Sequence, residues 1–383
     1  MAVAIGAALR WASRTQFFAS GFVFATWGVH IPTVKGHYGV DEAQLGFAML
    51  AAGFGALAGL SRAGRWIGHF GARGTARVCG TVYALLIAGL IAMPGYGALL
   101  ALLAVFGIAT SVFDVAINTE AAKLESLDGG TLMSGMHGMF SLGGMAGAVT
   151  GGAALAAGME PQTHLMWVAA VTAFAVLLAS QNMLPRAATT SASSVADEFN
   201  LPHGALVILG VLAALGLIAE GAIYDWSVLY LQQDLGSPQG EAALAYASFS
   251  AAMAAARFGG DAMRARFAPA VLLRGSAVLA AATMALVLVA RQPWLALLGF
   301  AGVGIGFANV VPILFSAAAR VPGVDPARGI AAVSAAAYLG FMAGPPVIGF
   351  VARVSSLGLA LWLVVGFAVA LAASARRVDA PRN

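Results

Sequence analysis

Twelve apolar stretches follow one another along the chain, and each is long enough to cross a membrane as a helix. A helix needs about 20 apolar residues to span the hydrocarbon core of a bilayer. The stretches are 14–34, 42–62, 75–93, 97–123, 132–157, 164–184, 204–231, 242–262, 270–290, 294–319, 329–351 and 356–375. Short polar or Gly-rich segments separate them. The pattern therefore predicts an all-α membrane protein with twelve transmembrane helices.

Composition points to the same class. Of 383 residues, 60% are hydrophobic and only 9% are charged, which is far from the balance of soluble globular proteins. The lipid bilayer is therefore an expected partner. The first span is too long for a secretory signal and lacks a small-residue cleavage site, so it is interpreted as a mature helix. The single Cys79 excludes an internal disulfide.

Lys and Arg residues fall unevenly on the two sets of loops that alternate spans create. With the N-terminus inside the cell, all but three of the 20 Lys and Arg residues lie on the cytoplasmic side; the exceptions are Lys35, Arg291 and Arg353. Cytoplasmic loops carry an excess of these residues. Both termini are therefore predicted to be cytoplasmic, in a multi-pass protein of a bacterial inner membrane. The net charge of +4 is a topology signal, and no nucleic-acid partner is expected.

The chain also contains two copies of a weak internal repeat. The segment Arg65–His69 reappears as Arg257–Asp261, and Leu142–Gly147 reappears as Leu339–Gly344 with a single difference. Both pairs are separated by about half of the chain. Between the copies lies Pro185–Gly204, a stretch rich in Ser, Thr and Ala that is typical of a flexible linker.

The repeat and the linker together predict three parts. These are an N-terminal six-helix bundle (1–184), a cytoplasmic linker (185–203) and a C-terminal six-helix bundle (204–383). Six helices, a linker and six further helices with a repeat form the layout of transporters whose solute site lies where the two halves meet.

The fourth span carries the most informative polar residues. Asp114 and Asn118 are four positions apart and share one helix face, whereas Glu120 points elsewhere. An ionisable residue at membrane depth costs a few kcal/mol and usually serves a function. Asp114 is thus a candidate for a proton or solute site, and Asn118 and Glu120 are candidates for solute binding. The alternative is that Asp114 only forms a hydrogen bond with a neighbouring helix.

Polar residues on other spans are further candidates for solute binding. Trp27 and His30 lie beside Pro32 near the outer end of the first span, although Trp27 also suits an interfacial aromatic.

The fifth span carries Gly143, Gly147 and Gly151, which recur every four residues and predict a smooth face for close helix contact. On the same span, His137 is expected to pair with Glu120 or Asn118, or to face solute. A structural hydrogen bond is an equally good explanation of a single membrane His.

The seventh span combines two acids with aromatic rings. Glu220 and Asp225 lie beside Tyr224 and Trp226, an arrangement that suits a sugar or a cation but also suits an interfacial aromatic belt. Asn309 lies in the middle of the Gly-rich tenth span and is another candidate for solute binding.

Two loops resemble those of the major facilitator superfamily. After the second span and after the eighth, members carry a Gly- and Arg-rich loop with an Asp, which acts as a latch between helices. Here the copies are Gly64–Arg73 and Ala256–Arg266. The resemblance implies latch roles for Arg65, Arg257 and Asp261. The first copy has no Asp at the matching place.

Other residues are similar to the fucose-permease-like branch of that superfamily. That branch has an acid four residues before an Asn in its fourth span, which implies a proton-coupling role for Asp114. Glu220 matches the acid of its seventh span and is the rival candidate for proton coupling. Pro312 with Phe315 matches a Pro-x-x-Phe element in the tenth. Fucose permease also has an Asp in the first span. No acid precedes Asp41 here, so a mechanism with two such carboxylates is not carried over.

The leading hypothesis is a proton-coupled secondary transporter, working by alternating access on a small polar, largely uncharged solute such as a sugar or sugar derivative. No Lys or Arg is expected at mid-membrane depth, where an anion carrier usually needs one. The alternatives are a proton-antiporting exporter of drugs or cationic metabolites and a transporter-derived membrane sensor. No catalytic or metal-ligand constellation occurs, so we expect neither an enzyme nor a cofactor. A monomer is expected.

Overall fold

The computed structural model describes residues 6–128, 132–189, 204–324 and 326–379, and these described residues form helices and no strands. They divide into two compact units. The first unit comprises Met1–Val40 and Ala48–Asp197, and the second comprises Asp41–Phe47 and Glu198–Asn383. Ten helices are long and apolar enough to cross a membrane in the described part of the chain.

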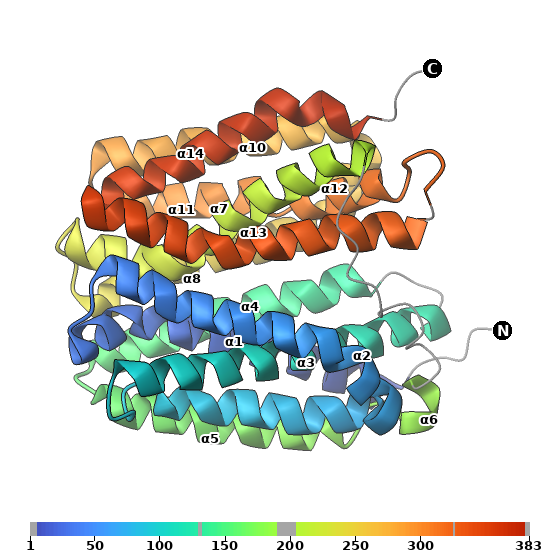
Figure 1. Cartoon of the computed structure of the whole chain (residues 1–383), viewed down its shortest axis with the longest axis horizontal. Coiled ribbons are helices and arrows are strands. Elements are labelled where there is room, and N and C mark those ends of the chain that lie inside the picture. The colour runs from blue at the N-terminus through green and yellow to red at the C-terminus, as the bar shows by residue number, and fades with distance from the viewer. Residues whose placement is uncertain (1–5, 129–131, 190–203, 325, 380–383) are drawn as a thin grey trace. The chain divides into compact units, whose positions relative to one another are not determined.

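The first unit contains the blue to green helices of Figure 1. They are α1 (Ala7–Tyr38), most of α2 (Glu42–Leu86), η1 (Ile87–Gly89), α3 (Tyr96–Asp128), α4 (Met133–Ala156), α5 (Pro161–Ser180) and α6 (Arg186–Thr189). Within this unit α1 packs mainly on α4 and α5.

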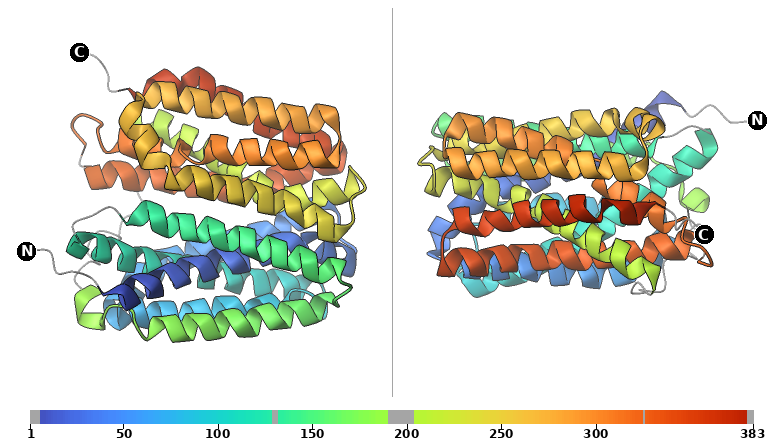
Figure 2. Two further views of the ribbon diagram at one scale, coloured as in Figure 1. Left: turned by 180° about the vertical axis from the view of Figure 1, so that it is seen from behind. Right: turned by 90° about the horizontal axis from the view of Figure 1, so that it is seen from above.

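The second unit contains the yellow-green to red helices. They are α7 (Ala205–Gln233), α8 (Gln239–Phe258), α9 (Gly260–Arg266), α10 (Pro269–Ala290), α11 (Pro293–Phe307), α12 (Val310–Ala318), α13 (Pro326–Val354), α14 (Leu357–Ser374) and η3 (Ala375–Val378). In this unit α7 packs mainly on α13, and α10 runs beside α11 (Figure 2).

Two features explain why ten long apolar helices correspond to twelve predicted spans. First, α2 is two helices in sequence, because Gly71 has φ 74° and ψ 163°, a backbone conformation that breaks the helix and that L side chains rarely adopt. The parts before and after Gly71 are the second and third spans. Second, α8 provides the eighth span but is less apolar than the ten. The prediction of an all-α membrane fold is confirmed.

Close contact between α1 and α4 explains the Gly-rich sequence of α4. A Cβ atom added to Gly143 would overlap the carbonyl oxygen of Phe18, and one added to Gly21 would overlap that of Phe140. At Gly147 the added atom would lie 2.6 Å from the carbonyl oxygen of Phe22. Small residues spaced four apart let two helices approach to backbone contact. The predicted packing face of the fifth span is therefore confirmed.

We expect Gly143→Ala to destabilise the protein by about 1–3 kcal/mol, the usual cost of adding an atom to a filled interior. The overlap is with backbone, so α1 and α4 must separate. Gly135→Ala on the same helix is the matched control, because a Cβ there would meet no atom within 4 Å. Thermal unfolding of both variants in detergent checks this. An equal loss of stability in the two variants would contradict the packing account.

The start of the predicted linker belongs to the fold of the first unit. Arg186–Thr189 forms α6, and the hydroxyl oxygen of Thr189 accepts a hydrogen bond of 3.1 Å from the backbone N–H of Ala72. A Cβ at Gly71 would lie 2.9 Å from the Cα of Arg186. These four residues were predicted to be flexible, but they dock on the break in α2. The rest of the predicted linker, 190–203, lies outside the described residues.

Candidate functional site

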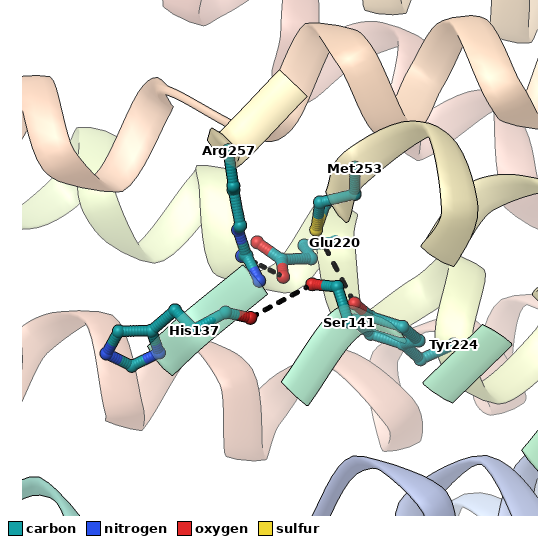
Figure 3. Close-up of polar contacts among 6 residues, drawn as sticks. All are labelled: His137, Ser141, Glu220, Tyr224, Met253 and Arg257. Carbon is teal, nitrogen blue, oxygen red and sulfur yellow. Dashed lines mark hydrogen bonds and ion pairs between the residues drawn. The ribbon is translucent and has the colours of Figure 1, made fainter. Parts of the chain in front are cut away.

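An ion pair joins α7 to α8 in the second unit. The guanidinium Nη2 of Arg257 lies 3.1 Å from Oε1 of Glu220, and the two side chains are 20% and 13% exposed, respectively (Figure 3). No Lys or Arg was expected at mid-membrane depth. That expectation is wrong at Glu220, in the middle of α7, because Arg257 reaches it from the neighbouring helix. Glu220 therefore has a neutralising partner.

Aromatic rings line the same contact between α7 and α8. Tyr224 follows Glu220 by one turn, and its hydroxyl donates to Sδ of Met253 at 3.5 Å (Figure 3). Its ring centroid lies 5.0 Å from that of Tyr246 and 4.9 Å from that of Phe249. Sequence reasoning did not single out Tyr246 and Phe249, whose only signal is their spacing of three on α8.

Asp225 and Trp226 come directly after Tyr224 on α7, so helix rotation places them on other faces of that helix. Both are buried, and the indole of Trp226 is fully enclosed. A Cβ at Gly349 on α13 would lie 3.3 Å from the Trp226 ring, so the indole packs toward α13. The structure thus brings Glu220 and Tyr224 together but leaves the other two predicted residues on a different face of α7.

Asp114 and Asn118 form a local pair on α3 in the first unit. The side-chain amide of Asn118 donates to the carbonyl oxygen of Asp114 at 2.9 Å and to its carboxylate Oδ1 at 3.1 Å. Both residues are half-buried. The shared face predicted from their spacing is confirmed. The Asn118 amide thus holds the Asp114 carboxylate on the face of α3 that the two residues share.

Glu120 does not join that pair. Its side chain is fully buried, and Oε1 accepts a hydrogen bond of 2.7 Å from the backbone N–H of Leu184, which follows α5. The expected partnership with His137 is absent: neither Glu120 nor Asn118 bonds to that ring in the described structure. The imidazole instead contacts the ring of Phe17, with centroids 5.5 Å apart.

Figure 3 also shows the backbone of His137, whose carbonyl oxygen accepts a hydrogen bond of 3.4 Å from the hydroxyl of Ser141. This bond is made within α4, from a side chain to the carbonyl one turn earlier. The imidazole of His137 takes no part in this bond and is half-buried. Its role in solute binding stays a prediction.

Variants at Glu120 separate a structural role from solute binding. Glu120→Gln keeps an oxygen that can accept the Leu184 N–H, so we expect nearly unchanged stability. Glu120→Leu leaves that N–H buried without an acceptor, and we expect a loss of about 2 kcal/mol, the usual cost of an unsatisfied buried donor. Thermal unfolding measures both. A Glu120→Gln variant that is as unstable as Glu120→Leu would contradict this assignment.

Trp27 and His30 lie in the interior. Trp27 is 5% exposed, and His30 is completely buried. Nε2 of His30 lies 2.9 Å from Nδ1 of His164 on α5. Sequence reasoning missed His164, which is a lone His at the start of an apolar span. Its only signal was its position at the same end of the bundle as His30.

Asp234, just beyond the membrane-spanning part of α7, joins the end of that helix to the start of α14. Its Oδ2 accepts a hydrogen bond of 3.0 Å from the backbone N–H of Gly358 at the start of α14. Burial raises the pKa of the Asp234 carboxyl above its ordinary value, and the Gly358 bond partly opposes that shift. The residue thus positions α7, which carries Glu220 and Tyr224.

Comparison with known families decides the class of protein. The model of the Major Facilitator Superfamily matches residues 15–327. The chain belongs to the major facilitator superfamily. It is 32% identical over 377 residues to an uncharacterized MFS-type transporter of Yersinia pestis, with 98% of this chain and 97% of the relative covered. It is 31% identical over 373 residues to the membrane protein MosC of Rhizobium meliloti, with 96% and 89% covered.

Solved structures of the superfamily share the fold. A D-xylose-proton symporter superposes with a TM-score of 0.74 at 13% identity, over 96% of both chains. The nucleoside transporter NupG gives 0.71 at 16% identity, over 97% of this chain and 98% of that one. A variant of the E. coli fucose:proton symporter FucP gives 0.62 at 17%, over 97% and 98%. Membership of the superfamily, shown by the family model and the relatives, makes the chain a multi-pass membrane transporter and not an enzyme.

The Gly- and Arg-rich loop of the second unit, where a latch is expected, contacts Asn309. In the second unit, Nη1 of Arg264 on α9 donates to Oδ1 of Asn309 at 3.2 Å. Asn309 lies where α11 ends and α12 begins, and it is buried. Asn309 was predicted to bind solute, and Arg264 was not singled out. The bond ties the Arg-rich loop to the break in the tenth span.

The other predicted latch residues do not form this contact. Arg257 pairs with Glu220, and Arg65 is exposed on α2, so the latch roles of both stay predictions. The side chain of Asp261 lies outside the described residues. In the first unit of this superfamily member, the break at Gly71 and its contact with α6 occupy the corresponding loop.

Proposed function

We propose that this chain is a proton-coupled secondary transporter that moves a small polar, largely uncharged solute, such as a sugar or sugar derivative, by alternating access. The observation that carries the proposal is the paired state of Glu220. With Arg257 at 3.1 Å, the cluster on α7 and α8 has both a hydrogen-bond acceptor and a donor but no net charge. A hydroxylated neutral molecule can bond to both groups.

Fold neighbours support the same class of solute, while the rings beside the ion pair back it from within. Tyr224, Tyr246 and Phe249 are buried and pack on one another, which gives the ion pair an apolar surround. The named fold neighbours, a D-xylose-proton symporter, a fucose:proton symporter and a nucleoside transporter, act on hydroxylated molecules and support this class.

The exporter of cations is the weaker candidate. Such a transporter attracts its solute with an uncompensated acid, and the guanidinium of Arg257 would repel a cation at Glu220. Asp225 is acidic but lies on another face of α7 and is buried.

Asp114 is proposed as the coupling carboxylate. Transfer into a low-dielectric interior favours the neutral form of a carboxyl group, so a proton can be held there. Asn118 carries both an amide donor and a carbonyl oxygen, so it can bond to Asp114 in either protonation state. Glu220 is less suited, because its proton would have to displace Arg257.

Uptake by proteoliposomes tests the proposal. The purified chain is offered radiolabelled D-xylose, fucose, uridine and the cation tetraphenylphosphonium, with an imposed pH gradient. We expect a neutral solute to accumulate above its equilibrium level, and a protonophore to abolish the accumulation. Gradient-driven extrusion of tetraphenylphosphonium with no movement of the neutral solutes would contradict the proposal and favour the exporter.

A further inference from the structure

A buried carboxyl lies at the end of the first unit that carries α6. The Glu120 side chain is completely buried, and its Oε1 accepts the backbone N–H of Leu184 at 2.7 Å. The other oxygen, Oε2, is also enclosed, and no described residue donates a hydrogen bond to it. Within the described part of the chain, Glu120 thus has one hydrogen-bond donor and no ion-pair partner.

Gln16 of α1 reaches the same segment between α5 and α6. Its amide Nε2 donates to the carbonyl oxygen of Val176 at 3.1 Å and lies 3.6 Å from Sδ of Met183, the residue before Leu184. The bond to a carbonyl requires the NH2 group, so the remaining atom, Oε1, is the amide oxygen, and it is buried without a donor as well. Two side chains therefore contact adjacent residues of this segment, and each keeps a buried acceptor oxygen that no described group satisfies.

An ionised Glu120 does not suit these surroundings. A carboxylate is an acceptor at both oxygens, and one enclosed with a single N–H donor loses its hydration without an equivalent replacement. A carboxylic acid needs less, because its carbonyl oxygen accepts the Leu184 N–H at Oε1 and its Oε2 carries a hydrogen of its own. The neutral form thus keeps the bond that the structure shows and removes the buried charge.

Most charged groups at this end of the first unit are cations, which favour the ionised form. On α3 and the elements around it they are Arg10, Arg14, Arg73, Arg77, Lys123 and Arg186, and the other titratable groups there are Glu125 and His137. Arg73 is the cation whose charge acts on Glu120, but it is half-buried and forms no ion pair with Glu120. Arg77 donates to Oγ of Ser180 instead. None of these cations therefore replaces the hydration that Glu120 has lost.

We propose that Glu120 is a proton-binding site of the first unit, held as a neutral carboxylic acid while Leu184 covers it. The site is separate from Asp114, which lies six residues earlier on a different face of α3. When Leu184 moves away from α3, water reaches the carboxyl and the proton is released. This inference does not depend on the proposed solute or on coupling by Asp114, since it concerns Glu120 and its surroundings alone.

Carbon NMR of the full chain in lipid nanodiscs tests the site, with 13C in the side-chain carboxyls of the seven Glu residues. Protonated and ionised carboxyls differ in chemical shift. We expect the signal that is lost in Glu120→Gln to be that of a protonated carboxyl at about pH 6, where an ordinary Glu is ionised. Glu160 is the control, because it is exposed and the N–H and hydroxyl of Thr163 hold its pKa below the ordinary value. The signal lost in Glu160→Gln should be ionised at that pH.

Thermal unfolding in detergent over a range of pH gives a second readout. Glu120→Gln resembles the protonated side chain but has no proton to lose, so the melting temperature of the wild type should fall below that of the variant as the pH rises. Glu120→Asp also removes one labelled Glu, and it identifies the signal if Glu120→Gln does not fold. The proposal is overturned if Glu120 is ionised at the same pH as Glu160, or if the melting temperatures of wild type and Glu120→Gln change with pH in parallel.

Discussion

Asp114→Asn is expected to abolish accumulation of solute against a gradient while leaving energy-independent exchange of solute across the membrane. The substitution keeps the size and polarity of the side chain, so Asn118 retains a hydrogen-bond partner at the position where it now donates to Oδ1 at 3.1 Å. What is lost is the group that binds and releases a proton. The ratio of inside to outside solute under an imposed pH gradient should fall to about one, as it does for any carrier without coupling.

Counterflow in proteoliposomes measures the exchange that Asp114→Asn should keep, since exchange of labelled for unlabelled solute needs no gradient. Glu220→Gln is the informative comparison, because Glu220 is the other half-buried carboxyl with a family match. If Asp114→Asn still concentrates solute while Glu220→Gln exchanges solute in counterflow but does not concentrate it, the two roles are reversed.

Breaking the ion pair between Glu220 and Arg257 is expected to have the largest effect on stability. Either Glu220→Gln or Arg257→Gln leaves one charge without its partner in a place where the side chains are only 13% and 20% exposed. We expect each single variant to lose about 3 kcal/mol, the lower end of the range for buried pairs. The double variant should lose clearly less than the two single losses together, because no uncompensated charge remains.

The chain offers a matched control for this cycle. Arg353 and Asp41 also form an ion pair, 3.3 Å between Nε and Oδ2, but their side chains are 57% and 37% exposed. Arg353→Gln should therefore cost at most about 1 kcal/mol, as exposed pairs do. Thermal unfolding in detergent compares the five proteins. Additive losses in the double variant would show that Glu220 and Arg257 do not stabilise the fold as a pair.

The sequence was most informative where the relevant contacts are local. The apolar spans follow from helix length, and the Asp114–Asn118 bond follows from a spacing of four on one helix. The glycines of α4 were also recognised as a packing face, because their spacing repeats with the helix period. In the first case the partner lies within one turn of the same helix. A packing face needs only a smooth neighbouring helix, so its partner need not be known.

Contacts between helices distant in sequence were not predictable in this way. Arg257 reaches Glu220 from another helix, and Arg264 reaches Asn309 across a longer separation. Periodicity shows which face of a helix is polar, but it does not say which neighbour that face meets. His164 illustrates the same limit, since a single His in an apolar span gives no hint of its partner.

Burial explains the change of role at Glu120. An acid in an apolar span suggests a functional site, and on this ground Glu120 was grouped with the solute-binding residues. The structure gives it a backbone donor, Leu184, and encloses it completely. The sequence contains no sign of this, because the donor is a main-chain N–H that every residue except Pro carries.

Proton movement driven by solute shows directly whether Asp114 couples the two. Proteoliposomes without an imposed gradient are given the neutral solute that the wild-type protein accumulates, and a pH-sensitive dye follows the outside medium. The account predicts that solute entry makes the outside medium more alkaline with the wild type, and that this change disappears with Asp114→Asn. Solute entry without proton movement in the wild type, or an unchanged proton signal with Asp114→Asn, would contradict it.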